Sequence, residues 1–242
     1  ENFDEQRCLA GMRERQFMTG IANYHIYSAE IAFLYGDYDR AQEHVYAQDR
    51  LIKSAMSLPQ LVRFYIVAFL TLASQYPSMT PAQQRETQTR LERDLARMTR
   101  WADNCPENFR HHQYLMQAEL ARLQGQSEQA LELFEAAIDA AGESGFIRDE
   151  ATACERAAQH LLGQGRKRAA EGYLRGACRL YERWGAHRKV SHMTRQFPIL
   201  IELLQPPSSA ANSTADLDLA SIMKASREIS GEIVLERLLK TS

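Results

Sequence analysis

The stretch from Tyr114 to Trp184 contains one spacing pattern twice, and this repeat constrains the fold more than any other feature of the chain. The first copy is centred on Gly125 and consists of Tyr114, Ala118, Ala121, Gly125, Ala130, Phe134 and Ala137. The second copy is centred on Gly165, forty positions later, and consists of Cys154, Ala158, Leu161, Gly165, Ala170, Leu174 and Ala177. A register kept across copies predicts helical hairpins stacked in tandem.

The glycines have a mechanical role in this pattern. A helix commonly ends at a residue with positive φ, which glycine adopts without a steric penalty. Alanines one and two turns before the glycine let the paired helices approach closely. The larger residue of the second helix, Phe134 or Leu174, is expected to fill the gap between neighbouring hairpins.

A third copy of the pattern surrounds Gly36, with Ala29 and Ala41 at the corresponding positions. The three copies resemble the tetratricopeptide repeat (TPR). This resemblance implies an all-α fold, a TPR-like right-handed superhelical stack of antiparallel helix hairpins with a separate C-terminal helix. We expect the stack to occupy residues 1–204.

Hydrophobic periodicity predicts the remaining helices of the stack. Their expected ranges are 3–35, 58–76, 80–103 and 188–203. A break near Gly11 or Gly20 is expected in the first, and the second is apolar enough to lie in the middle of the stack. Thr80 is a candidate cap for the third. Pro198 should kink or interrupt the last.

The chain changes character after the predicted stack. Residues 205–216 are rich in Pro, Ser, Ala and Asn, as is typical of a flexible linker. Residues 217–242 form an amphipathic segment broken at Ser230-Gly231. Because an isolated helix of this length is marginal in water, we expect it to pack against the stack or against a second copy, giving a homodimer through 217–240.

Composition excludes several classes of function. The formal net charge of −2 removes the electrostatic argument for a nucleic-acid binder. Four cysteines without a CxxC spacing (Cys8, Cys105, Cys154 and Cys178) indicate reduced core thiols in a cytoplasmic protein. The most apolar run, Leu58 to Ala73, contains Arg63 and is too short for a membrane span.

Seven histidines raise the question of a metal or catalytic site. His111 and His112 are adjacent, so we expect them to point to different helix faces and not to share an ion. The sequence has no HExxH, GxSxG or Gly-rich phosphate loop. We therefore expect no catalytic, cofactor-binding or metal-binding residue and no cofactor, and the sequence leaves the residues that bind a partner unidentified.

Arginines recur at helical spacing in two stripes: Arg90, Arg93, Arg97 and Arg100, and then Arg175, Arg179 and Arg183. Either stripe is suited to an acidic peptide or a nucleotide phosphate. The acidic neighbours Glu86, Glu92 and Asp94, and Glu171 and Glu182, favour solvated faces with intrahelical ion pairs. Four tyrosines near the N-terminus are expected to pack in the core and between hairpins rather than form a ligand cage: Tyr24, Tyr27, Tyr35 and Tyr38.

Three segments carry a more specific resemblance. RWADNCPENF at 100–109, the later LYERWGAHRKV with Phe197-Pro198, and the terminal LDLASIMKASREISGEIVLERLL resemble the helical region of large multidomain hybrid kinases. Those kinases join a serine/threonine kinase-like domain, an AAA/STAND-type ATPase, a TPR-like region, a GAF domain and a sensor histidine kinase. The resemblance covers about residues 20 to 240.

The resemblance implies a non-catalytic sensor or regulatory segment of such a signalling kinase, in which 217–242 leads towards a GAF domain. The segment itself is then not an enzyme, whereas its parent is a serine/threonine or histidine kinase with an ATPase module. Its partners would be other domains of the parent kinase or a peptide segment. The alternative is the sensor arm of a STAND-type ATP-dependent transcriptional activator, which would carry a helix-turn-helix after the repeats.

Overall fold

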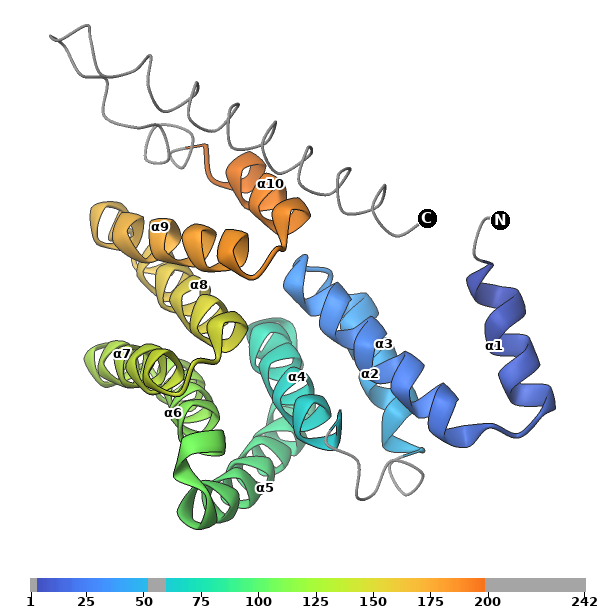
Figure 1. Cartoon of the computed structure of the whole chain (residues 1–242). Coiled ribbons are helices and arrows are strands. Elements are labelled where there is room, and N and C mark those ends of the chain that lie inside the picture. The colour runs from blue at the N-terminus through green and yellow to red at the C-terminus, as the bar shows by residue number, and fades with distance from the viewer. Residues whose placement is uncertain (1–3, 52–59, 199–242) are drawn as a thin grey trace, which may run out of the picture. The chain divides into compact units, whose positions relative to one another are not determined.

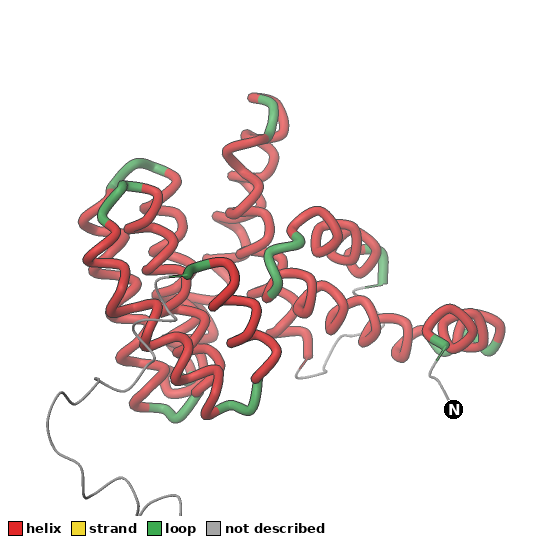
Figure 2. The backbone as a smooth tube through the Cα atoms, turned by 90° about the horizontal axis from the view of Figure 1, so that it is seen from above, coloured by secondary structure: helices red, strands yellow, loops and turns green. Residues whose placement is uncertain are grey.

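The computed structural model describes residues 4–51 and 60–198. Within those ranges the chain is all-α, with ten helices packed as sequential antiparallel pairs (Figure 1). Short loops join the helices, and no strand occurs in the described ranges (Figure 2). The helices are α1 (Glu5–Glu14), α2 (Met18–Leu34), α3 (Tyr38–Asp49), α4 (Gln60–Gln75), α5 (Pro81–Asn104), α6 (Pro106–Leu123), α7 (Ser127–Glu143), α8 (Ile147–Gly163), α9 (Lys167–Arg183) and α10 (His187–Gln196), and a 3-10 turn (Tyr76–Ser78) follows α4.

Five turns between helices share one geometry built on glycine. Each glycine has φ between +73° and +86°: Gly36, Gly125, Gly145, Gly165 and Gly185. At Gly125 the glycine N–H donates to the carbonyl of Arg122 and the next N–H, of Gln126, donates to Ala121, which is the Schellman pattern. The predicted stops at Gly36, Gly125 and Gly165 are confirmed.

Gly145 and Gly185 were not predicted, yet they end α7 and α9 in the same way. From Gly125 onward a helix therefore ends every twenty residues, at 125, 145, 165 and 185. In the α6–α7 and α8–α9 hairpins both helices, and not only the first, are terminated by a left-handed glycine. The repeating unit is thus a single helix with its turn.

Neighbouring helices pack in sequence, α2 on α3, α6 on α7 and α8 on α9. Helix α4 lies between the first pair and the later ones, because it contacts α2 and α3 on one side and α6 on the other (Figure 1). Ten consecutive residues of α4, 64–73, are buried, as its all-round apolar sequence predicted. Phe134 and Leu174 are also buried, as expected.

Helix α5 begins with the predicted cap. The Oγ1 atom of Thr80 accepts from the N–H of Gln83, while the Gln83 side chain accepts from the N–H of Thr80. This reciprocal capping box satisfies two donors that the first helical turn leaves without partners. Helix α5 ends at Asn104, and α6 begins at Pro106, where a proline is tolerated because its missing N–H would have had no partner.

One predicted boundary differs from the structure. The break between α1 and α2 falls at 15–17, where Gln16 has φ 52°, and not at Gly11 or Gly20, which lie inside helices. Helix α10 ends at Gln196, in agreement with the interruption predicted at Pro198, because the residue before a proline disfavours the helical conformation. Residues 199–203 lie outside the described residues. The predicted linker at 205–216 and helix at 217–242 lie outside the described residues.

The N-terminal tyrosines only partly follow the expectation of core packing. Tyr38 packs against Phe33, with ring centroids 5.7 Å apart. Tyr27 and Tyr35 are 46% and 37% exposed, so neither is buried in the core. Tyr35, at the end of α2, nevertheless packs between helices, because its ring lies 5.2 Å from that of His192 on α10.

Candidate functional site

A groove of about 360 Å³ is lined by α2, α4, α6 and the start of α8. Its apolar lining is Phe33, Leu34, Val62, Ile66, Val67, Leu70, Phe109, Leu115 and Phe146. Its polar lining is Glu30, Arg63, Asn108, His112, Arg148, Asp149 and Thr152. A mostly apolar concavity with a few convergent polar groups is the usual form of a binding site. We therefore take this groove as the candidate functional site.

Charged side chains from three helices meet at the groove. Glu30 on α2 accepts from Arg63 on α4 and, at 2.8 Å, from Nη1 of Arg148 on α8. Arg148 also binds the carboxylate of Asp149, its Nε lying 2.9 Å from Oδ1. Burial raises the pKa of Glu30 and Arg148 opposes that rise. These side chains form a connected, partly desolvated network. In it the positive charges of Arg63 and Arg148 balance the negative charges of Glu30 and Asp149.

Two adjacent histidines of α6 point into the same region. His111 and His112 are 2% and 8% exposed, and their ring centroids lie 3.9 Å apart. The Nε2 atoms of His111 and His112 lie 3.5 and 3.9 Å from Oδ2 of Asp149. His111 also stacks on Phe146, at a centroid distance of 4.6 Å. The expectation that the two histidines face apart is wrong, because rotation about the side-chain bonds directs both rings to one carboxylate.

The protonation of this cluster follows from its burial. Burial lowers the pKa of His112 to about 4, although Asp149 opposes the change. Burial alone would raise the pKa of Asp149, but the approach of His111 and the charges of His112 and Arg148 outweigh it and lower that pKa. At neutral pH the cluster therefore offers a neutral His112 imidazole and an ionised carboxylate.

Two further buried ion pairs hold helices together outside the groove. Glu119 on α6 accepts from Arg156 on α8 and from Arg122. Glu155 on α8 accepts from Nζ of Lys189 on α10, at 2.7 Å, and from the hydroxyl of Tyr181, at 2.9 Å. Lys189 also donates to the main-chain carbonyl of Leu34, at the end of α2. These pairs are satisfied within the protein and serve packing.

Three arginines of the first stripe pair with Asp94 of the same helix, as predicted, but Asp94 is buried and does not lie on a solvated face. Asp94, which is 1% exposed, lies within 3.6 Å of Arg90, Arg93 and Arg97. Arg90 also makes a two-point contact with Asp49 of α3. A hollow of about 750 Å³ lies beside this stripe, between α3 and α5, and its lining is largely polar. Because its arginines already have partners, this hollow is the weaker candidate.

The second stripe and the cysteines show no comparable organisation. Arg179 and Arg183 are exposed on α9. All four cysteines are free, with Cys154 and Cys178 buried and Cys8 and Cys105 partly exposed. Burial raises the pKa of the Cys154 thiol to about 12, which makes it inert as a nucleophile.

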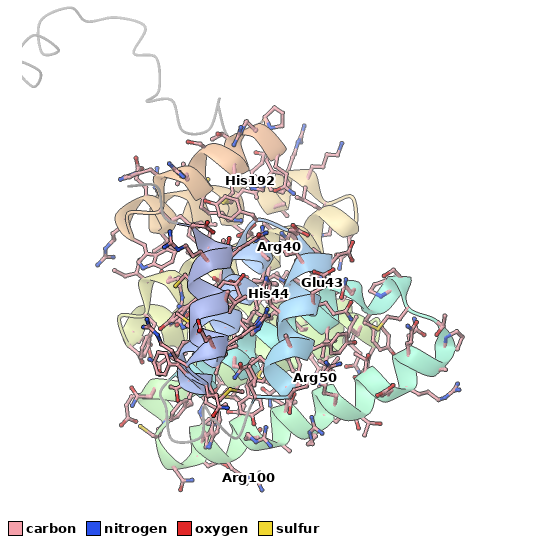
Figure 3. The ribbon with its side chains drawn as sticks, turned by 90° about the vertical axis from the view of Figure 1, so that its right-hand side faces the viewer. Arg40, Glu43, His44, Arg50, Arg100 and His192 are labelled. Atoms are coloured by element: carbon pink, nitrogen blue, oxygen red, sulfur yellow. The ribbon has the colours of Figure 1, made fainter. Side chains whose placement is uncertain are left out.

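The other histidines do not join the groove. His25 and His44 pair through their Nδ1 atoms at 2.9 Å between α2 and α3. Figure 3 shows Arg40, Glu43 and His44 on α3, with Arg100 of α5 and His192 of α10 at opposite ends of the view. His192 and Arg100 lie apart from the neighbouring residues Arg40, Glu43 and His44, so the five do not form one site. Among the described residues, only His111, His112 and Asp149 place three ligand atoms within 4.8 Å of one another.

Comparisons with known proteins give no relative. No family model, curated protein or solved structure matches this chain. Within the described ranges, none of the helices combines the length and the apolar character needed to cross a membrane.

Proposed function

We propose that the chain is a non-catalytic interaction segment of a multidomain signalling kinase, and that its groove binds another protein segment. On this proposal the described helices form a TPR-like right-handed superhelical stack. Two observations support the stack: the glycine stops at a twenty-residue period, and contacts between alternate helices, α2 with α4, α4 with α6 and α6 with α8. A stack of this kind offers one continuous surface to a partner.

The observation that carries the proposal is the groove between these alternate helices. An apolar floor bounded by Glu30, Arg63, Arg148 and Asp149 suits an amphipathic peptide segment. The volume of about 360 Å³ is that of a pocket for one or two large side chains. We infer that one or two anchor side chains of a partner enter the pocket, while its polar groups meet the charges at the edge.

The partner on this proposal is another domain of the same kinase or a peptide segment. Binding would hold the kinase in one regulatory state, because a ligand shifts an equilibrium only by its preference for one state. The arrangement favours binding over catalysis. The carboxylates of Glu30 and Asp149 are paired with arginines and hence poorly placed to exchange protons.

Kinase output in the full-length protein tests this proposal. Val62→Glu and Thr152→Arg place a charge or bulk in the groove at two half-buried positions. We expect either change to alter the regulated phosphorylation rate. Glu132→Lys, at an exposed position of α7 outside the groove, is the control and should leave the rate unchanged. Unchanged output in both groove variants, with normal circular dichroism and melting temperature, would refute the proposal.

A further inference from the structure

We propose that His111, His112 and Asp149 bind a single Zn²⁺ ion at the inner end of the groove. The inference stands on the geometry of these three side chains and does not depend on the proposed kinase context. Two imidazoles and one carboxylate are a ligand set that Zn²⁺ uses with a fourth position left open. His112 and Asp149 line the groove, so that the open position would face it.

The distances from the Asp149 carboxylate to the two histidines are close to those around a tetrahedral ion. With metal–ligand bonds of about 2.0–2.1 Å, the edge of a tetrahedron is about 3.4 Å. The observed separations from Asp149 Oδ2 are 3.5 Å to His111 Nε2 and 3.9 Å to His112 Nε2. Small rotations of the side chains therefore close the site around an ion. Octahedral edges, at about 3.0 Å, fit less well.

The same atoms fit poorly as a set of direct hydrogen bonds. An N–H···O bond is normally 2.7–3.2 Å long, shorter than either contact with Asp149. Neither nitrogen of His111 has a hydrogen-bond partner, although the residue is 2% exposed. Nδ1 of His112 likewise has none. A buried polar atom without a partner costs about 1–3 kcal/mol, and an ion bound to the Nε2 atoms would remove that cost for His111 Nε2.

The surroundings hold the carboxylate in the orientation that an ion needs. Arg148 binds Oδ1 of Asp149, with Nε at 2.9 Å, so Oδ2 is directed to the histidines. Glu30 in turn binds Arg148 at 2.8 Å and offsets its charge. Such outer contacts orient metal ligands in known sites. On the other side, the stacked ring of Phe146 fixes the His111 imidazole.

Metal binding would join α6 to α8. The two histidines belong to α6 and Asp149 to the first turn of α8, so that an ion links helices that are separated in sequence by α7. An ion that binds only the folded chain stabilises it by mass action.

Titration of the metal-free, full 242-residue chain with ZnCl₂ tests the site. A competing chromophoric chelator gives the affinity and the number of ions per chain. We expect one Zn²⁺ per chain, a melting temperature that rises with Zn²⁺, and reversal by excess chelator. Co²⁺ in place of Zn²⁺ should give the visible absorption of a low-coordinate site. Absence of binding by the folded wild-type chain would overturn the proposal.

Variants locate the ion. Asp149→Asn preserves the shape of the side chain, and His112→Gln preserves most of the volume. Each should weaken Zn²⁺ binding by at least about tenfold and abolish the Co²⁺ band. His187→Gln, an exposed histidine of α10, is the matched control and should bind as the wild type does. Equal affinity in wild type and both site variants would place the ion elsewhere and refute this assignment. If one variant fails to fold, the other variant and the wild-type Co²⁺ spectrum still test whether the ion binds at this site.

Discussion

Nε of Arg156 lies 2.5 Å from Oε1 of Glu119, and both side chains are buried between α6 and α8. Nε of Arg122, one turn away on α6, lies 2.8 Å from the other carboxylate oxygen. The carboxylate therefore holds two cations, one on each helix. A buried pair of this kind contributes little net stability when intact, but removing one partner leaves a charge without compensation.

Glu119→Gln should accordingly destabilise the fold by about 3–5 kcal/mol, because Arg156 remains buried without a counter-charge. Urea unfolding measures the change. The matched control is the double variant Glu119→Leu with Arg156→Met, which removes both buried charges. The stability lost in the double variant should be well below the sum of the losses in the single variants Glu119→Leu and Arg156→Met. Additive losses would show that the two residues do not interact.

Lowering the pH should weaken the ion pairs of Glu119 with Arg156 and Arg122 in a defined pH range. Burial opposes ionisation of Glu119, but Arg156 and Arg122 outweigh it and lower its pKa from 4.5 to about 2. The stabilisation is therefore complete above pH 4.5 and is lost as the pH falls towards 2, because the unfolded chain binds the proton first. A shift of this size corresponds to about 3 kcal/mol. Urea unfolding at successive pH values should show wild type and Glu119→Gln converging over that range; a constant difference would contradict the assignment.

Gly145→Ala should destabilise the protein by about 1–2 kcal/mol, since φ is +75° at this position. An added Cβ would meet no atom within 4 Å, so the effect comes from the backbone alone. Gly172→Ala is the matched control, because Gly172 lies inside α9 with equally open surroundings. That change should stabilise the fold by about 0.5–1 kcal/mol. Thermal unfolding compares the two, and a loss at both positions would argue against the left-handed turn.

Phe134→Ala should destabilise the fold by about 3–5 kcal/mol, because the side chain is fully buried and its removal leaves a cavity. The ring of Phe134 on α7 lies 5.8 Å from that of His160 on α8, so the cavity would separate these two helices. Tyr27→Ala, at an aromatic position that is 46% exposed, is the control and should change stability by less than about 1 kcal/mol. Denaturant unfolding measures both, and similar losses would contradict the assigned core.

Much of the fold was predictable because its signals are local. A left-handed turn at the end of a helix strongly favours glycine, so Gly36, Gly125 and Gly165 could be recognised without a structure. Gly145 and Gly185 obey the same rule, but they end the second helix of each hairpin, and the forty-residue repeat of whole hairpins conceals the twenty-residue spacing of single helices.

The candidate site was not predictable in this way. Asp149 lies 37 positions beyond His112, on another helix, and only the packing of α6 against α8 brings the two together. The prediction for His111 and His112 was wrong because it rested only on the direction in which each Cβ leaves the helix. The position of a Cβ around a helix gives the starting direction of a side chain, whereas a histidine ring can turn by rotation about two bonds.

The hydrogen bond from Lys189 to the main-chain carbonyl of Leu34 affects how the protein unfolds locally. In a linear array each unit contacts only its neighbours, so that either end can fray alone. Here donor and acceptor are 155 positions apart, and the ring of His192 also rests 5.2 Å from that of Tyr35. Opening of α10 therefore exposes the end of α2. Amide hydrogen exchange in the last turn of α2 and in α10 should be governed by one shared opening event, which makes these two segments a single cooperative unit.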